Sequence, residues 1–201
     1  MECDTRQQIL NAAEELFSQK GFNGTPVRDI AQLADVNVAA INYHFRNKRE
    51  LLHEVLKTGY IHLSKEVSRI AKKNTDSFVE LTGAIFNVLL KNDKIVLNCM
   101  KIILDEGFDD FDDIGVDDEM IGPPGGMILF DMITKEVGTD IDEASRKWAV
   151  VSIFSIMFHK ALVIKSPYGK RPTVKKVMNK NKSLEDITRL AQLILNDLKS
   201  K

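Results

Sequence analysis

The chain has 201 residues, of which 44% are hydrophobic and 28% are charged. These proportions are typical of a folded protein of one or two domains, and they exclude wholesale disorder. The sequence has no run of about 18 uncharged apolar residues, the length that spans a bilayer, and it does not begin with a secretory signal pattern. Its two cysteines, Cys3 and Cys99, show no metal-ligand spacing. We therefore expect a cytoplasmic protein with no membrane partner.

Charge is segregated along the chain, although the formal net charge is only −1. Residues 1–73 carry 11 basic and 9 acidic side chains, residues 74–164 carry 7 and 17, and residues 165–201 carry 10 and 3. Nine of the acids lie within 105–119, whereas 165–182 holds seven basic side chains and no acid. The acidic run fits a solvated loop, a site for a cationic effector, or a partner for the basic segment.

Apolar residues recur every three to four positions almost throughout, which predicts an all-α fold of about nine helices. The predicted helices, in chain order, span about 5–20, 26–34, 38–45, 48–73, 77–90, 94–104, 127–137, 142–164 and 183–199. The basic segment between the last two contains two prolines and is predicted to be a linker.

Residues with known end preferences mark the limits of these helices. Gly21 can adopt the left-handed conformation that stops the first helix. Thr25 is predicted to cap the second helix, with Pro26 in its first turn, and Asn37 to cap the third. Ser183, with an acid three residues later, is predicted to cap the last helix reciprocally.

Three short helices within residues 5–45, the last two joined by a tight turn, have the layout of a helix-turn-helix unit that binds DNA. A recognition helix must bring its N-terminal turn close to the major groove, and the small side chains of Ala39 and Ala40 permit this approach. Ile41 and Phe45 are four residues apart and can anchor the helix to the core. The polar side chains that this arrangement turns outward are Asn42, Tyr43 and His44.

The sequences TPVRDIA at 25–31 and ADVNVAAINYHF at 34–45, followed by Lys48 and Leu51-Leu52, closely resemble the N-terminal signature of the TetR family of transcriptional regulators. The resemblance covers about forty-five residues without gaps. The chain departs from the family pattern at Asp35, where glycine is common in the turn. Aspartate is among the few residues that tolerate a left-handed conformation, so we expect the turn to be kept.

The resemblance implies a homodimeric regulator that is not an enzyme and needs no cofactor. Residues 1–47 would form the DNA-binding domain, and residues 48–201 a body that binds a small-molecule effector and forms the dimer through its last two long helices. Such a protein reads a palindromic DNA operator, and the effector usually releases it, which favours a repressor. The effector's identity, the operator sequence and the choice between repression and activation stay open.

Carried over position by position, the resemblance also implies the DNA contacts. Thr25 and the start of the second helix would contact phosphate, as would Lys48, whereas Tyr43 and His44 would contact phosphate or base edges. Ala39, Ala40 and Asn42 would face the bases. The complete predicted set is Thr25, Pro26, Arg28, Asn37, Ala39, Ala40, Asn42, Tyr43, His44 and Lys48.

Two further sets of apolar residues are predicted for the body. Effector cavities are mostly apolar, and the candidates here are Phe78, Phe86, Met100, Leu104, Phe108, Met127, Phe130 and Phe158. Paired long helices bury apolar stripes in a dimer, and the candidates are Trp148, Ile153, Ile156, Leu184, Ile187, Leu190, Leu193 and Ile194.

Two other classes of function remain as alternatives. A metal-dependent helical enzyme would use the cluster of Asp109, Asp110, Asp112 and Asp113, but the sequence contains none of the common catalytic motifs. A helical adaptor that binds only protein would leave the polar face of the third helix unexplained. His53 and His62 lie on opposite sides of one predicted helix, so we predict no metal site.

Overall fold

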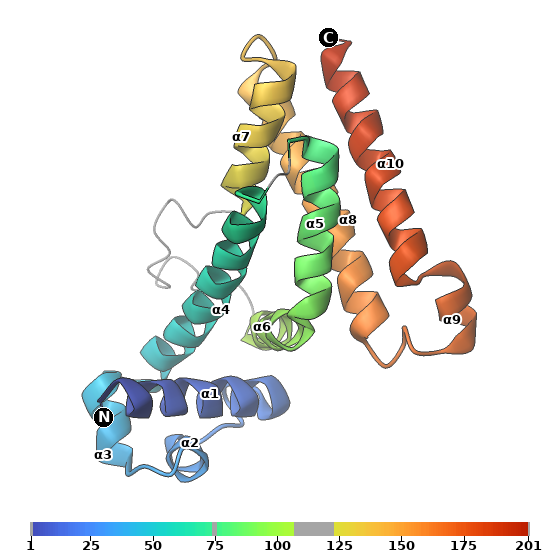
Figure 1. The fold of residues 1–201 in the computed structure, drawn as a ribbon. Coiled ribbons are helices and arrows are strands. Elements are labelled where there is room, and N and C mark those ends of the chain that lie inside the picture. Colours follow the sequence, from blue (N-terminus) through green and yellow to red (C-terminus); the bar gives the residue numbers. More distant parts are fainter. Residues whose placement is uncertain (1, 74–75, 107–122, 201) are drawn as a thin grey trace. The chain divides into compact units, whose positions relative to one another are not determined.

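The structure, a computed structural model, describes residues 2–73, 76–106 and 123–200 and consists of helices and connecting loops in this part of the chain (Figure 1). The predicted all-α class is therefore confirmed. Most of the acidic run, including the aspartate cluster at 109–113, lies outside the described residues. The helices are α1 (Glu2–Lys20), α2 (Val27–Leu33), α3 (Val38–His44), α4 (Lys48–Ala71), α5 (Phe78–Lys91), α6 (Asp93–Glu106), α7 (Gly126–Val137), α8 (Glu143–Lys165), α9 (Pro172–Val177) and α10 (Lys180–Lys199).

The described residues form ten helices rather than the nine predicted, because the basic segment contains the short helix α9. Pro172 occupies the first turn of α9, where its missing N–H costs no hydrogen bond. The last helix begins at Lys180, and the side chain of Asn179 caps it by accepting a hydrogen bond from the Lys182 N–H at 3.1 Å. The predicted cap at Ser183 was wrong, because this residue is already inside the helix and buried.

The chain forms two compact units, and the division falls within α4. The first unit comprises the described residues of 1–61 and 94–121, and the second comprises those of 62–93 and 122–201. The sequence places the domain boundary at residue 47, whereas the first compact unit continues to residue 61 and includes the described residues of 94–121. A compact unit is not a functional domain, and the boundary stays a prediction. Each unit has its own buried apolar side chains and therefore its own hydrophobic core.

The first unit packs α1, α2, α3 and the start of α4, which together we call the head, around one apolar core, the head core. Its largest fully buried side chains include Ile9, Phe17, Ile30, Ile41, Phe45 and Leu51. Ile102 of α6 belongs to the same core. Because α2 and α3 have only seven residues each and would be marginal in isolation, this shared burial is what holds them as helices.

The turns of the head follow most of the predictions. Gly21 has a left-handed φ of 71° after α1, and Asp35 has a φ of 54° in the turn before α3. The side chain of Asn37 caps α3, accepting a hydrogen bond from the Ala40 N–H at 2.7 Å. Thr25 does not cap α2, contrary to prediction. Its hydroxyl is buried and donates to the Gly21 carbonyl oxygen at 2.7 Å.

The second unit packs α5, α7, α8 and α10 together. Phe78, Phe86, Ile153 and Ile187 are among its fully buried side chains. A polar contact crosses this unit between α8 and α10, where the Lys160 Nζ lies 2.7 Å from a carboxylate oxygen of Asp186. A buried lysine needs such a partner, because desolvation of an unpaired ammonium is costly.

Helix α8 is long and apolar enough to cross a membrane by length and composition alone, although it contains Lys160 within its apolar stretch. Only 33% of its most apolar window is buried within the chain. Its packing against α5, α7 and α10 is that of a helix in a bundle. Large apolar side chains of α8, including Trp148 and Val151, are therefore exposed on the surface of the second unit.

Candidate nucleic-acid interface

Helix α3 has one buried and one exposed side, as the sequence predicts for a recognition helix. Ile41 and Phe45 are each 1% exposed and fix α3 on the head core. The guanidinium of Arg6 lies 5.1 Å from the centroid of the Phe45 ring and covers it from α1. Ala39, Asn42 and Tyr43 lie on the exposed side. The anchoring therefore leaves a polar, sterically open face.

Tyr43 is the most prominent side chain of that face. It is 75% exposed, and its ring meets the half-buried His44 edge-on, with 5.2 Å between the ring centroids. A phenol and an imidazole held in this way can donate or accept hydrogen bonds at base edges or phosphates. The arrangement brings together two side chains that the sequence assigns to DNA contact.

The N-terminal turn of α3 is open as well. Asn37 and Ala39 are exposed, and Ala40 is half-buried with its N–H bonded to the Asn37 side chain. A shallow hollow lies beside this turn, lined by Ala31, Gln32, Asp35, Val36, Asn37 and Ala40. The exposed side chains at the end of the helix that a recognition helix inserts into the groove are therefore those of Asn37, Val38 and Ala39.

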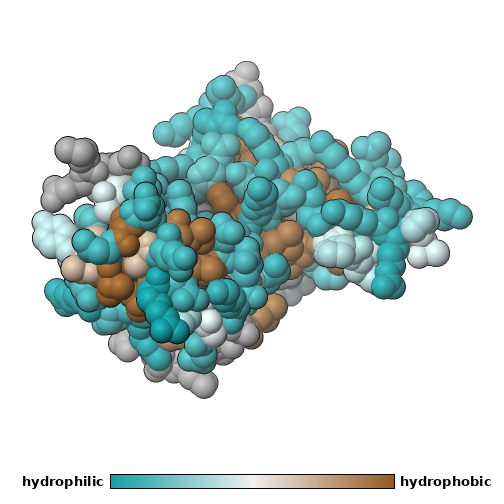
Figure 2. Space-filling view, turned by 90° about the horizontal axis from the view of Figure 1, so that it is seen from below, coloured by the Kyte–Doolittle hydropathy of each residue, from teal (hydrophilic) through white to brown (hydrophobic). Residues whose placement is uncertain are grey.

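The exposed surface of the head is otherwise mixed. Leu33 and Val38 are exposed apolar side chains on α2 and α3. Brown side chains also interrupt the hydrophilic surface at the left of Figure 2, where this face of the head is seen. Arg28, near the start of α2, has an 84% exposed side chain and lies 3.8 Å from Asp29. Pro26 is exposed immediately before α2.

Lys48 is held inside the head rather than extended into solvent. Its Nζ donates hydrogen bonds to the carbonyl oxygens of Phe22 at 2.6 Å and Thr25 at 2.9 Å. It also lies 4.1 Å from the centroid of the Phe22 ring. Two of its three N–H donors are therefore used to fix the loop between α1 and α2, which leaves one donor for a phosphate.

Two other cations of the head form ion pairs with carboxylates. Lys20 pairs with Asp29 at 3.0 Å, and Arg6 pairs with Glu54 of α4. The sequence could not reveal these pairings, because their partners are far apart along the chain. Their role is to position the helices, and they reduce the number of cations available to an anionic partner.

The predicted effector residues fall in both units and at different depths. Met100 and Leu104 lie in the first unit, and Leu104 is exposed. In the second unit Phe78 and Phe86 are fully buried, Met127 is exposed, and Phe130 and Phe158 are half-buried. The guanidinium of Arg146 lies 5.2 Å from the centroid of the Phe130 ring. Phe108 lies outside the described residues, so the effector site stays a prediction.

The predicted dimer residues divide into two groups. Ile153, Ile187 and Ile194 are buried in the core of the second unit, so their side chains pack within one chain and are not available to a partner. We correct the prediction for these three. Trp148 and Leu193 are exposed, and Ile156, Leu184 and Leu190 are half-buried. Val151, which the sequence did not single out, is also exposed on α8.

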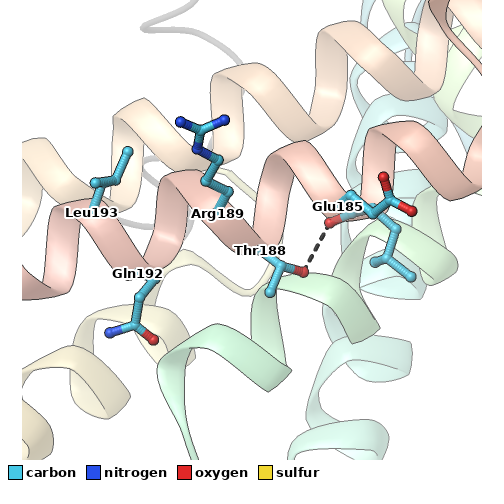
Figure 3. A pocket seen from close by; sticks show the side chains of 6 residues that line it. Glu185, Thr188, Arg189, Gln192 and Leu193 are labelled. Atoms are coloured by element: carbon cyan, nitrogen blue, oxygen red, sulfur yellow. Dashed lines mark hydrogen bonds between the residues drawn. The ribbon is translucent and has the colours of Figure 1, made fainter.

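A shallow pocket lies on the exposed face of α10 (Figure 3). Its lining comes from this single helix and consists of Leu184, Glu185, Thr188, Arg189, Gln192 and Leu193. The Thr188 hydroxyl donates to the Leu184 carbonyl oxygen at 2.8 Å. A smaller hollow nearby is lined by Ala144, Ser145, Trp148 and Asp197, from α8 and α10. Both are open surface features with apolar and polar lining.

Among the residues that the structure describes, no three histidine, cysteine or acidic side chains are grouped as metal ligands. The aspartate cluster of the alternative enzyme hypothesis lies outside these residues. His62 is instead within hydrogen-bond distance of the Asn92 side chain, at 3.0 Å.

Comparison with known proteins identifies the helix-turn-helix unit. Residues 9–55 match the family described as "Bacterial regulatory proteins, tetR family". The chain is 41% identical over 91 residues to the "Probable HTH-type transcriptional regulator YttP" of Bacillus subtilis, an alignment that covers 44% of each protein. It is 36% identical over 88 residues to the HTH-type transcriptional regulator TtgR of Pseudomonas putida, covering 44% of this chain and 40% of TtgR. The chain thus matches less than half the length of these relatives.

The whole fold has solved counterparts. A TetR-like transcriptional regulator from Rhodococcus sp. RHA1 superimposes with a TM-score of 0.65 at 14% identity, covering 96% of both chains. At this identity the similarity establishes the fold alone.

Proposed function

We propose that this chain, whose N-terminal domain belongs to the tetR family of bacterial regulatory proteins, is a sequence-specific DNA-binding transcriptional regulator. The observation that carries the proposal is the two-sided character of α3. Ile41 and Phe45 bury one side in the head core, whereas Asn42 and the 75% exposed Tyr43 lie on the other. A rigidly anchored helix with an open polar face is what readout of base edges in the major groove requires.

The contacts divide by chemistry. Asn42 and the small residues Ala39 and Ala40 would face the bases, since an amide can pair with adenine and small side chains allow close approach. Tyr43 and His44 would contact base edges or phosphates. Arg28, Pro26 and the start of α2 would lie along the phosphate backbone, together with the remaining N–H donor of Lys48. Asn37 would act by capping α3. The Thr25 side chain is fully buried and not available to phosphate, contrary to the prediction, so it would act by its hydrogen bond to the Gly21 carbonyl oxygen.

The proposed active form is a homodimer on a palindromic operator. Two-fold symmetric proteins read two-fold symmetric sites, and the half-sites of helix-turn-helix dimers are about 34–36 Å apart when separated by one turn. The exposed side chains of Trp148, Val151 and Leu193 support an interface on α8 and α10. Apolar groups of this size on adjoining helices gain stability when a second copy covers them.

A small-molecule effector and a repressor role complete the proposal. The effector must bind the DNA-free and DNA-bound conformations with different affinity, since only that difference can change occupancy of the operator. Helix α4 contributes residues to both units, which supports a role in connecting effector binding with DNA binding. Relatives named as negative regulators include IcaR of Staphylococcus aureus, which is 27% identical over 84 residues.

The test is a selection of duplexes from a randomised library by the purified chain, with excess non-specific competitor DNA and at two salt concentrations. We expect enrichment of a palindrome that the wild-type chain retains and a Tyr43→Ala variant does not. Enrichment of no sequence, with retention that disappears at the higher salt, would overturn the proposed function. A palindrome equally enriched by both proteins would remove Tyr43 from the contact set.

A further inference from the structure

The strongest concentration of exposed positive charge in the described part of the second unit lies on α9 and the start of α10. We call this the basic surface, and its members are Lys170, Arg171, Lys175, Lys176, Lys180 and Lys182. All six side chains are exposed. The region around α9, at the right of Figure 2, is mostly hydrophilic. The proposed DNA contacts of the head make no use of this surface.

Among the described residues, the contacts of the basic surface are with carbonyl oxygens and an aromatic ring. Lys165, which precedes it, pairs with Asp93 at 3.1 Å. Within the surface, the Lys182 Nζ donates to the Lys176 carbonyl oxygen at 2.6 Å, and the Arg171 guanidinium lies 5.6 Å from the centroid of the Tyr168 ring. Among the described residues, no carboxylate lies within 4.0 Å of any of the six cations.

The helix ends increase the positive potential further. The first turn of α10 contains no acid and carries Lys180 and Lys182, and α9 has no acid in its first turn either. The N-terminal end of a helix carries partial positive charge, which acids usually offset. Here the dipole of the 20-residue helix α10 adds to the lysine charges. Six cations and a helix end of the same sign form a surface that a polyanion would stabilise.

We propose that the basic surface binds the phosphate backbone of double-stranded DNA without reading its sequence. Regularly spaced phosphates attract exposed lysines and arginines and release condensed counterions, and no particular base is needed. In the head, Lys20, Arg6 and Lys48 are engaged by groups of the chain itself, whereas Arg28 and Arg46 are exposed. The second unit would therefore add to the salt-dependent affinity that the head provides.

A membrane surface fits the same charges less well. Helices that lie in the membrane interface present an apolar face along their length, whereas α9 has six residues and its strongly exposed apolar side chain is Val177, at 71%. The other exposed large apolar side chain nearby is Tyr168, which the Arg171 guanidinium approaches. The surface therefore offers cations to a phosphate polymer but little apolar area to a bilayer.

The test compares two triple variants of the full chain. Lys175→Gln, Lys176→Gln and Lys180→Gln together remove three charges from the basic surface. The matched control is Lys72→Gln, Lys135→Gln and Lys199→Gln, which removes three exposed lysines elsewhere in the second unit. Binding to a non-palindromic duplex about 20 base pairs long, two helical turns, is measured by fluorescence anisotropy over a series of salt concentrations.

We expect the basic-surface variant to lower the magnitude of the slope of log K against log salt by about 2–3, because each phosphate contact contributes about 0.9. The control should keep the wild-type slope. Equal slopes for both variants and wild type would overturn the inference. Lysine acetylation of the wild-type chain provides a readout without substitutions: DNA should protect Lys175, Lys176 and Lys180 and leave Lys72, Lys135 and Lys199 reactive, and uniform reactivity would contradict the inference.

Two further measurements separate the inference from its competitors. Loss of binding to phosphatidylglycerol vesicles with an unchanged DNA slope would make the basic surface a membrane contact and overturn the inference. The palindrome selection with Tyr43→Ala tests the proposed function by itself. A chain that enriches no palindrome but shows the expected slope change would keep the inference and lose sequence-specific regulation. A chain that enriches a palindrome but shows an unchanged salt slope would keep sequence-specific regulation and lose the inference.

Discussion

The ammonium of Lys48 lies 2.6 Å from the carbonyl oxygen of Phe22 and 4.1 Å from the centroid of the Phe22 ring. One residue of the loop after α1 thus receives both a charge-assisted hydrogen bond and a cation–π contact from the first residue of α4. The same ammonium bonds the Thr25 carbonyl oxygen at 2.9 Å. The loop that leads into α2 is therefore fixed from α4, which links the position of α2 to the start of the helix that continues into the second unit.

Lys48→Met should lower the free energy of unfolding by about 1–3 kcal/mol, because it removes hydrogen bonds made by a charged group. Denaturant unfolding followed by circular dichroism measures this change. DNA affinity should also fall because α2 loses a support, but the salt slope should change by no more than about 0.9, the value for one phosphate contact. Lys65→Met removes an exposed lysine from the same helix as a control. Unchanged stability of the Lys48 variant would refute the positioning role.

Tyr43→Ala should weaken binding to the selected palindrome by about tenfold to a hundredfold, since one good contact in the groove contributes about 1–3 kcal/mol. The unfolding midpoint should stay the same, because Tyr43 is 75% exposed. Tyr43→Phe separates the two parts of the side chain in the same anisotropy assay. If the phenylalanine variant binds like wild type, the ring makes the contact, and if it binds like the alanine variant, the hydroxyl does.

Asp186→Asn should destabilise the second unit by about 1–2 kcal/mol. The Lys160 side chain is 11% exposed and loses its carboxylate partner, and the 59% exposure of Asp186 moderates the effect. Adding Lys160→Met to this variant should restore part of the stability, because no buried charge is then left unpaired. Thermal unfolding of Asp186→Asn, Lys160→Met and the double variant provides a double-mutant cycle. Asp131→Asn is the control at an exposed aspartate of α7. Additive effects of the two substitutions would show that the pair is not coupled.

Leu193→Glu should shift the proposed dimer toward monomer in sedimentation velocity at micromolar concentration. Leu193 is exposed on the face of α10 drawn in Figure 3, and a buried charge in an interface is costly. The matched control is Leu104→Glu, the same change at an exposed leucine of α6. Deleting the last helix is a poorer test, because α10 contributes buried core residues such as Ile187 and Leu198. A dimer that survives Leu193→Glu would move the interface away from this face.

Burial raises the pKa of the Cys99 thiol from 9.0 to about 12, with a smaller contribution from the Glu14 carboxylate. Between these values the unfolded chain loses the thiol proton and the folded chain keeps it, so this group lowers stability as pH rises above about 9. In a Cys3→Ser variant, iodoacetamide should react slowly with the native chain at pH 9 and quickly after unfolding. Cys99→Ala should remove this part of the pH dependence, and rapid native alkylation at pH 9 would contradict the burial of the thiol.

The helix-turn-helix unit was predictable from the sequence because its determinants are local. Gly21, Asp35 and Asn37 set the ends of short helices through their own backbone and capping preferences. The four-residue spacing of Ile41 and Phe45 selects the buried side of α3 and thereby its exposed side. Each signal lies within a few residues of the structure it determines, so periodicity and capping rules were sufficient.

Predictions that depended on distant partners were less successful. The sequence assigned Thr25 to a cap, whereas its hydroxyl donates to the Gly21 carbonyl oxygen. It assigned Ser183 to another cap, which Asn179 provides instead. Ile153, Ile187 and Ile194 have the apolar character of an interface, but an apolar side chain satisfies an internal core equally well. Only the packing of α5, α7, α8 and α10 decides between these two uses.

The sequence by itself thus determined the helical class, the helix-turn-helix unit and the exposed face of α3, because helix periodicity and capping act over a few residues. The tertiary structure decided which cations are already engaged. Lys48 and Lys20 find partners inside the head, whereas the lysines at 175, 176 and 180 stay exposed without a carboxylate among the described residues. Electrostatic pairing depends on distances in space, which the order of residues along the chain does not contain.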